Sequence, residues 1–191
     1  MKLKLKGTLH WEAEVRRVFE EDTPMAIGVT GPWSITEQAA RGILRDFFYW
    51  RLDDPEFNLL EVNVDIQTGA LAGIAIPLYN GALHDLITAV DEGSAQDAKG
   101  IPRVDMDPWT SIINGPTVTK YFSVPGRCRF ELGAETLRVA LFPEPVSFRV
   151  SINDALLWEF NEQAELCAFV VKRLEEPEIA AIRSYVSRKR N

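Results

Sequence analysis

The sequence predicts a single α+β domain over residues 1–191, formed by a mainly antiparallel β-sheet with two or three flanking helices. The length of 191 residues is typical of one domain with an elaboration. Hydrophobic residues make up 46% and charged residues 26% of the chain, which is an ordinary globular composition and excludes disordered, collagen-like and coiled-coil proteins. Short apolar runs that end at Gly, Pro, Asn or Asp predict many short strands.

The first half of the chain contains three regions with strand-like patterns. Apolar and polar side chains alternate over residues 3–15, which indicates a half-buried strand followed by a short helical turn. Met25–Thr30 is typical of a short buried strand or an extended connector. Phe57–Ile66 and Ala70–Tyr79 are β-rich runs joined by the turn residues Gln67-Thr68-Gly69, so they predict a β-hairpin.

Two helices are indicated by the residues at their starts. Ser34-Ile35-Thr36-Glu37 has the pattern of a capping box, and an apolar stripe follows it, so a helix is expected over Ile35–Arg51, before the break at Asp53-Asp54-Pro55. The second helix is expected to begin at Glu175-Glu176-Pro177-Glu178, where proline and acidic residues suit a helix N-terminus. Its inward residues are predicted to be Ile179, Ile182 and Val186.

After residue 117 the chain is predicted to be almost entirely β-structure before the last helix. The apolar runs are short and are separated by Gly, Pro, Asn or Asp, a spacing typical of an antiparallel meander. The predicted strands are Val118–Val124, Arg127–Leu132, Leu137–Phe142, Phe148–Ile152, Leu156–Phe160 and Leu166–Leu174.

Residues 80–117 form the least regular part of the chain, with one short helix expected where Leu83, Leu86, Ile87 and Val90 recur. The segment is acidic, and only Lys99 and Arg103 oppose its carboxylates. One interpretation is a solvated loop. The other is an exposed protein-binding surface, in which the acids attract a basic partner and an aromatic residue anchors it. The acidic residues are Asp85 and the candidate partner-binding residues Asp91, Glu92, Asp97, Asp105 and Asp107, followed by the aromatic candidate Trp109.

The net charge of −7 and the pI of about 5.0 argue against nucleic-acid binding, because phosphate recognition needs a positive field. The only basic run, Arg188-Lys189-Arg190, suits the negative end of the last helix. No signal peptide is expected, since Met1–Gly7 has no apolar stretch after it. The uncharged run from Ile66 to Leu83 is broken by turn residues, so we expect no membrane span and a cytoplasmic protein.

Few residues in the sequence supply reactive chemistry, and no phosphate-binding, hydrolase or zinc-protease motif is present. His10 and His84 are isolated, and Cys128 and Cys167 are expected to be buried free thiols, so no metal or other cofactor is expected. Paired carboxylates remain as an alternative acid–base or cation site. The two groups with that potential are Asp105-Met106-Asp107 and Asp53-Asp54-Pro55-Glu56.

The segment Asp65-Ile66-Gln67-Thr68-Gly69 lies between two apolar runs and has a counterpart at Asn161-Glu162-Gln163-Ala164-Glu165, which is also followed by leucine and an apolar strand. Two hairpins of one type explain this likeness without a duplication. The first hairpin, with its D-x-x-T-G turn, resembles a hairpin of small acidic bacterial immunity proteins of polymorphic toxin systems. That resemblance implies a cytoplasmic, non-catalytic protein that blocks a cognate toxin.

Two functions of different classes therefore remain. The first is a protein-binding protein, most concretely an immunity protein, whose acidic segment occupies the basic site of a toxin domain. The second is an enzyme or a small-molecule- or metal-binding protein that uses carboxylates in a cleft against the sheet. The first predicts association with a steep salt dependence, and the second predicts stabilisation by a ligand or metal. The sequence leaves the oligomeric state open.

Overall fold

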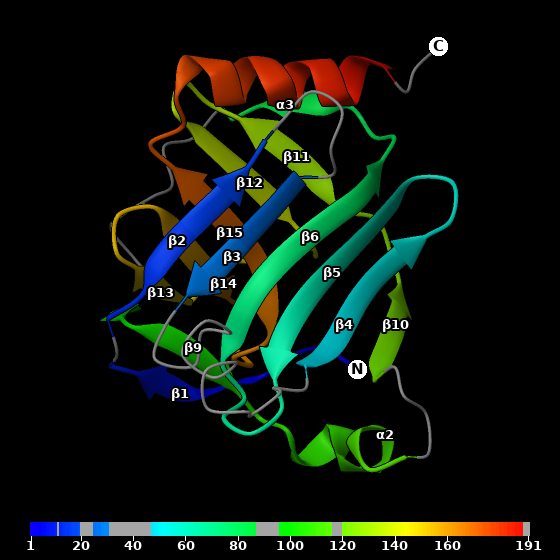
Figure 1. The fold of residues 1–191 in the computed structure, drawn as a ribbon, viewed down its shortest axis with the longest axis vertical. Coiled ribbons are helices and arrows are strands. Elements are labelled where there is room, and N and C mark those ends of the chain that lie inside the picture. The colour runs from blue at the N-terminus through cyan, green and yellow to red at the C-terminus, as the bar shows by residue number, and fades with distance from the viewer. Residues whose placement is uncertain (11, 20–24, 31–46, 87–95, 116–119, 189–191) are drawn as a thin grey trace, which may run out of the picture.

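Two β-sheets lie face to face in the computed structural model, and their inward side chains form one shared core (Figure 1). The structure describes residues 1–10, 12–19, 25–30, 47–86, 96–115 and 120–188. The first sheet has six strands in the order β10-β4-β5-β6-β3-β2. These strands are β2 (Glu14–Val18), β3 (Met25–Thr30), β4 (Phe47–Asp54), β5 (Asn58–Asp65), β6 (Leu71–Tyr79) and β10 (Tyr121–Pro125).

The second sheet has seven strands in the order β7-β11-β12-β15-β14-β13-β8. A separate two-stranded ribbon pairs β1 (Leu5–Leu9) with β9 (Ile101–Val104). The strands of the second sheet are β7 (Leu83–Asp85), β8 (Gln96–Lys99), β11 (Arg129–Leu132), β12 (Thr136–Ala140), β13 (Phe148–Ile152), β14 (Leu156–Phe160) and β15 (Leu166–Lys172). The expected α+β class with mainly antiparallel strands is confirmed, but two sheets and a ribbon replace the expected sheet.

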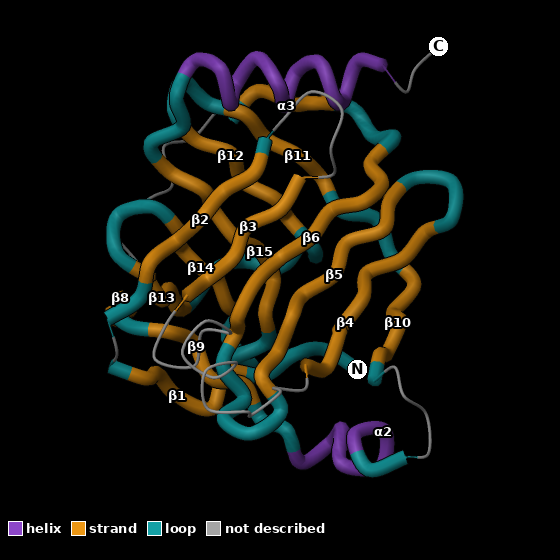
Figure 2. The backbone as a smooth tube through the Cα atoms, in the orientation of Figure 1, coloured by secondary structure: helices purple, strands orange, loops and turns teal. Residues whose placement is uncertain are grey.

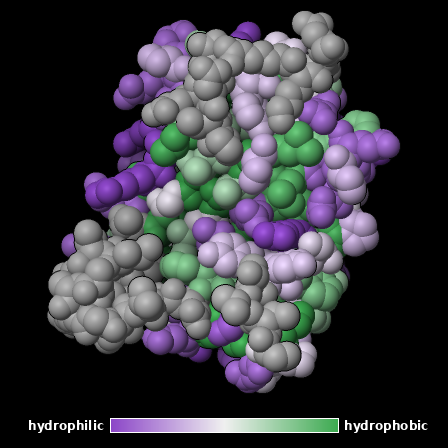
Figure 3. All heavy atoms as spheres, turned by 45° about the vertical axis from the view of Figure 1, so that its right-hand side comes forward, coloured by the Kyte–Doolittle hydropathy of each residue, from purple (hydrophilic) through white to green (hydrophobic). Residues whose placement is uncertain are grey.

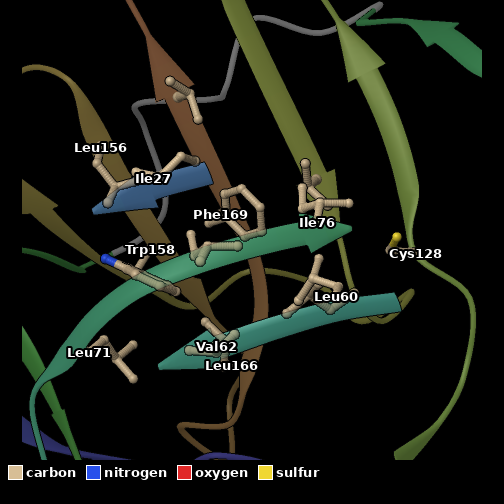
Figure 4. Close-up of a cluster of buried hydrophobic side chains, with 14 of the residues drawn as sticks. Ile27, Leu60, Val62, Leu71, Ile76, Cys128, Leu156, Trp158, Leu166 and Phe169 are labelled. Atoms are coloured by element: carbon tan, nitrogen blue, oxygen red, sulfur yellow. The ribbon is translucent and has the colours of Figure 1, made fainter. Parts of the chain in front are cut away.

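The core lies between the sheets, and alternation along the strands places its residues there (Figure 4). On β4, for example, the buried residues are Phe48, Trp50 and Leu52, while the residues between them are partly exposed. The first sheet contributes Ile27, Leu60, Val62 and Ile76, and the second contributes Leu156, Trp158, Leu166 and Phe169. On the face shown in Figure 3, hydrophobic residues gather near the middle and hydrophilic residues surround much of them.

The helix expected over Ile35–Arg51 is wrong at its C-terminal end, because Phe47–Asp54 is strand β4. The remaining part, residues 35–46 with the capping box, lies outside the described residues. The segment fits two patterns. A helical stripe would contain Phe47, Phe48 and Arg51, whereas the alternation of a strand places Phe48, Trp50 and Leu52 on one face. The segment forms a strand because it pairs with β5 on one side and with β10 on the other. Tertiary pairing therefore decides the structure of this segment.

The strand expected over residues 3–15 is two strands, β1 in the ribbon and β2 at the edge of the first sheet. No helical turn follows Val15 among the described residues, because β2 continues to Val18 and pairs with β3. The predicted strand Met25–Thr30 is confirmed as β3, and the predicted hairpin is confirmed as β5 and β6.

The six strands predicted after residue 117 are confirmed as β10 to β15, but they do not form a simple meander. β12 pairs with β15 instead of β13, and β10 joins the first sheet parallel to β4. Two further parallel pairs, β7 with β11 and β8 with β13, add strands from the middle of the chain to both edges of the second sheet.

The same five-strand arrangement occurs in both sheets. β2–β6 follow the order β4-β5-β6-β3-β2, and β11–β15 follow the order β13-β14-β15-β12-β11, with antiparallel pairing throughout. The likeness between the Asp65 and Asn161 segments is therefore not limited to two hairpins of one type. It belongs to a unit that occurs twice, and the ribbon joins the two copies.

The C-terminal helix is confirmed as α3 (Glu176–Arg188), which lies along one end of the sandwich (Figure 2). The Glu175 backbone N–H donates to the Glu178 carboxylate at 2.8 Å, which stabilises the helix start. Ile182 and Val186 are buried and Ile179 is half-buried, as predicted. The Tyr185 hydroxyl donates to the Ile76 carbonyl at 3.2 Å and fixes the helix to β6.

The segment predicted as irregular is more ordered than expected. Of residues 80–117, the structure describes β7, β8 and β9, a 3₁₀ helix η1 (Asp107–Trp109) and a short helix α2 (Thr110–Ile113). Leu83 belongs to β7, so the short helix expected there does not begin at this residue. Ile87 and Val90 lie outside the described residues.

Candidate functional site

The carboxylates of Asp105 and Asp107 lie directly after β9, where the chain leaves the ribbon. The Asp105 backbone N–H donates to the Lys4 carbonyl at 2.8 Å, and its carboxylate lies 3.5 Å from Lys6 Nζ. The same carboxylate accepts a hydrogen bond from the Asp107 backbone N–H at 3.3 Å. Asp107 is exposed and Asp105 is half-buried, so the structure brings these two predicted residues together at the surface.

Trp109 occupies a different position from the one expected. It is only 1% exposed, and its ring lies 5.0 Å from that of Phe48 and 5.1 Å from that of Phe122. The expectation of an exposed aromatic contact residue is therefore wrong. The physical reason is that β4 and β10, neighbouring strands of the first sheet, present the rings of Phe48 and Phe122 to η1, and burial of an indole against them removes a large apolar surface from water.

The other predicted acidic residues are not gathered at this place. Asp97 is exposed on the edge strand β8, opposite Arg149 of β13. Asp85 is exposed on β7, at the opposite edge of the same sheet. Asp91 and Glu92 lie outside the described residues. Among the described residues, the predicted acidic surface is thus reduced to the Asp105–Asp107 pair.

The D-x-x-T-G turn supports this acidic pair through the ribbon. Asp65 Oδ1 accepts hydrogen bonds from the Thr68 backbone N–H at 2.8 Å and from its hydroxyl at 2.6 Å. The turn in this form presents the Gly69 carbonyl to the Val104 backbone N–H, at 2.9 Å. The hairpin therefore holds the last residue of β9, and Asp105 follows it immediately.

The second turn of this kind holds the other strand of the ribbon. Asn161 Oδ1 accepts hydrogen bonds from the backbone N–H groups of Gln163 and Glu165, at 3.0 and 2.9 Å. The Ala164 carbonyl accepts a hydrogen bond from the Leu5 backbone N–H at 2.7 Å. Because Leu5 pairs with Val104, the ribbon is fixed to both sheets at equivalent turns.

A row of paired charges crosses the outer face of the second sheet. Glu159 is 1% exposed and accepts hydrogen bonds from Arg138 at 2.8 Å and from Arg149 at 3.3 Å. Arg138 also donates to Glu131 at 2.9 Å. Burial by itself would lower the pKa of Arg138, but the two carboxylates outweigh burial and hold that pKa above its usual value.

Beside this row the surface is hollowed, with a volume of about 520 Å³. The hollow lies against the outer face of β8, β13, β14 and the end of β15. The labels of β8, β13 and β14 are on the left of Figure 2, and that of β15 is nearer the middle. Among the described residues, Asp97 is the one predicted partner-binding residue in its lining. The described charged residues of the lining are Asp97, Lys99, Arg149, Asp154, Lys172 and Arg173.

Sequence reasoning missed this hollow, because its charged residues come from separate strands and are more than 70 positions apart at the extremes. Of its described charged residues, the sequence singled out only Asp97, as a candidate partner-binding residue, and Lys99, as a charge opposing the acidic segment. The hollow corresponds to the cleft against the sheet in the alternative hypothesis, but most of its described charged residues are cationic. Asp105 and Asp107, the carboxylates expected there, are not among them.

The remaining candidate reactive groups lie apart from both places. Cys128 and Cys167 are buried free thiols, as predicted, and burial raises the pKa of each to about 12, so both are protonated at neutral pH. His10 and His84 are exposed. Within the described ranges, no group of three or more His, Cys, Asp or Glu side chains is arranged to hold a metal ion.

Comparison with known proteins gives no relative from which a role could be transferred: no family model and no curated protein matches this chain. No helix in the part of the chain that the structure describes is long and apolar enough to cross a membrane.

Proposed function

We propose that this protein binds a basic protein partner, without chemical conversion of that partner, through the surface around Asp105 and Asp107. The observation that carries the proposal is the rigid support of this acidic pair. Lys4 holds the backbone of Asp105, and the buried Trp109 fixes the chain just after Asp107. An acidic surface that is ordered before association loses little conformational entropy when a partner binds.

The charge of the chain supports the same proposal. With a net charge of −7, the protein attracts cationic surfaces from a distance, and the exposed Asp107 beside the half-buried Asp105 orients such a partner during the encounter. The more specific form of the proposal is that the partner is the basic active-site region of a toxin and that this protein is its immunity protein. The D-x-x-T-G hairpin favours this form, and the two free cysteines suit a cytoplasmic location.

Affinity capture with charge-matched variants tests the proposal. The immobilised protein is exposed to lysate of the native host, and the retained proteins are identified by mass spectrometry. We expect one basic protein to be retained by the unaltered chain and lost from the double variant Asp105→Lys/Asp107→Lys. The control Glu56→Lys/Glu162→Lys changes the net charge equally at two other exposed positions and is expected to retain the partner.

The kinetics of the captured pair give a second measurement. The association rate with the purified partner should fall steeply as the salt concentration rises, and the Asp105→Lys/Asp107→Lys variant should lose most of this salt dependence. Failure to retain any protein, or equal retention by both double variants, would count against the proposal. The melting temperature of each variant shows whether it remains folded.

A further inference from the structure

We propose that the hollow on the outer face of the second sheet binds a small phosphate-bearing ligand of about nucleotide size. Its volume of about 520 Å³ lies within the range of small-molecule sites, roughly 300–1,000 Å³. The inference is independent of the partner proposed above, because neither Asp105 nor Asp107 lines the hollow.

The charge of the lining is opposite to that of the chain as a whole. Among the residues that the structure describes, four cationic side chains line the hollow against two carboxylates, whereas the whole chain carries a net charge of −7. Asp154 and Arg173 lie 2.8 Å apart and neutralise each other at the rim, which leaves Lys99, Lys172 and Arg149 against Asp97. A local positive field in a concave surface favours an anionic ligand.

Two of the cations lack an ion-pair partner within the described part of the chain. Lys99 and Lys172 make no ion pair or side-chain hydrogen bond with any other residue that the structure describes. The Arg149 guanidinium, in contrast, is 3.3 Å from Glu159, so it is held in place at the floor. Two flexible ammonium groups and one fixed guanidinium in the same lining can together bind the oxygens of a phosphate group.

The sheet register gives the separation of the two lysines across the sheet. Lys99 is opposite Ser151, and Ser151 is opposite Leu157 on the next strand. Leu157 in turn is opposite Val170 of β15, two positions before Lys172. Three strand spacings separate β8 from β15, which is about 14 Å. The floor between the two lysines contains the apolar side chain of Leu157. A ligand with phosphate groups and a flat or apolar part spans this floor better than an isolated ion does.

Isothermal titration calorimetry at low ionic strength tests the inference with four probes: ATP, AMP, inorganic phosphate and a glutamate-rich peptide. We expect saturable binding of ATP or AMP to the unaltered chain and weaker binding of inorganic phosphate. The variant Lys99→Gln/Lys172→Gln should weaken nucleotide binding at least tenfold. The control Lys4→Gln/Arg183→Gln removes the same charge at exposed positions outside the hollow and should stay within twofold of the unaltered chain.

Four results would overturn the inference. These are no binding of any phosphate-bearing probe, equal weakening by both double variants, inorganic phosphate binding as tightly as ATP, and binding of the acidic peptide alone. The last result would assign the hollow to an acidic protein segment instead of a small molecule. Since neither lysine has a partner in the described structure, the melting temperature of the hollow variant should equal that of the control, which excludes misfolding as the cause of weaker binding.

Discussion

Replacement of Gly69 by alanine should destabilise the whole fold, because this residue joins the first sheet to the ribbon. Its φ of +74° lies in the left-handed region, where a side chain costs about 1–2 kcal/mol. A Cβ at this position would lie 2.5 Å from the Val104 carbonyl oxygen, a backbone atom that moves only with β9. Such a movement stretches the hydrogen bond from the Val104 N–H to the Gly69 carbonyl, which contributes about 1 kcal/mol more.

The total expected loss for Gly69→Ala is about 3 kcal/mol, which lowers the melting temperature of a chain of this size by about 6–12 °C. Thermal and urea unfolding followed by circular dichroism measure it. Gly28→Ala is the matched control, because nothing lies within 4 Å of a Cβ added there, and its expected change is below about 1 kcal/mol. Ala164→Gly, at the equivalent turn with φ of +59°, should also change stability by less than about 1 kcal/mol. Equal melting temperatures for Gly69→Ala and Gly28→Ala would refute this reasoning.

Three further predictions concern buried polar groups. Glu159→Gln should lower the free energy of unfolding in urea by about 3 kcal/mol, because it removes the buried carboxylate between two arginines. The control Asp154→Asn alters an exposed ion pair and should lower it by less than about 0.5 kcal/mol. Asn58→Ala should cost about 2–4 kcal/mol, since it leaves two carbonyls and the Cys128 N–H without their side-chain partner; a loss below about 1 kcal/mol would contradict this. A disulfide reagent should label Cys128 and Cys167 only after unfolding. The folded thiols keep their protons to about pH 12, whereas the unfolded thiols lose theirs near pH 9. The free energy of unfolding should therefore decrease as the pH rises from about 9 to about 12, and it should decrease less steeply when both cysteines are replaced by alanine.

Alternation and turn residues were enough to predict the central parts of the fold. The β5–β6 hairpin, the strands of the second half and α3 were predicted correctly, because each has a local signal in the chain: a period of two, a glycine or asparagine turn, or a proline and acids at a helix start. The pairing of these strands has no such signal. Val139 on β12 faces Phe169 on β15, thirty positions later, and no local rule predicts that choice over pairing with β13.

The candidate site, too, was predictable only where the signal is local. The sequence identified Asp105 and Asp107 from their charge and spacing, but it treated Trp109 as exposed, because an aromatic residue in an acidic, irregular segment carries no local sign of burial. In the folded chain it packs against the rings of Phe48 and Phe122, which are distant in sequence. Lys99 and Lys172 could not be associated from the sequence, since 73 positions and three strand spacings separate them.

The sequence by itself determined the acidic charge, the β-rich composition and the local turns, because these depend on residue type and near neighbours. Only the tertiary structure decided that two like five-strand units face each other, that a ribbon joins them at Gly69 and Ala164, and that cations converge on one outer face. The reason is physical: long-range strand pairing is selected by the burial that the whole chain achieves, and no short segment contains that information.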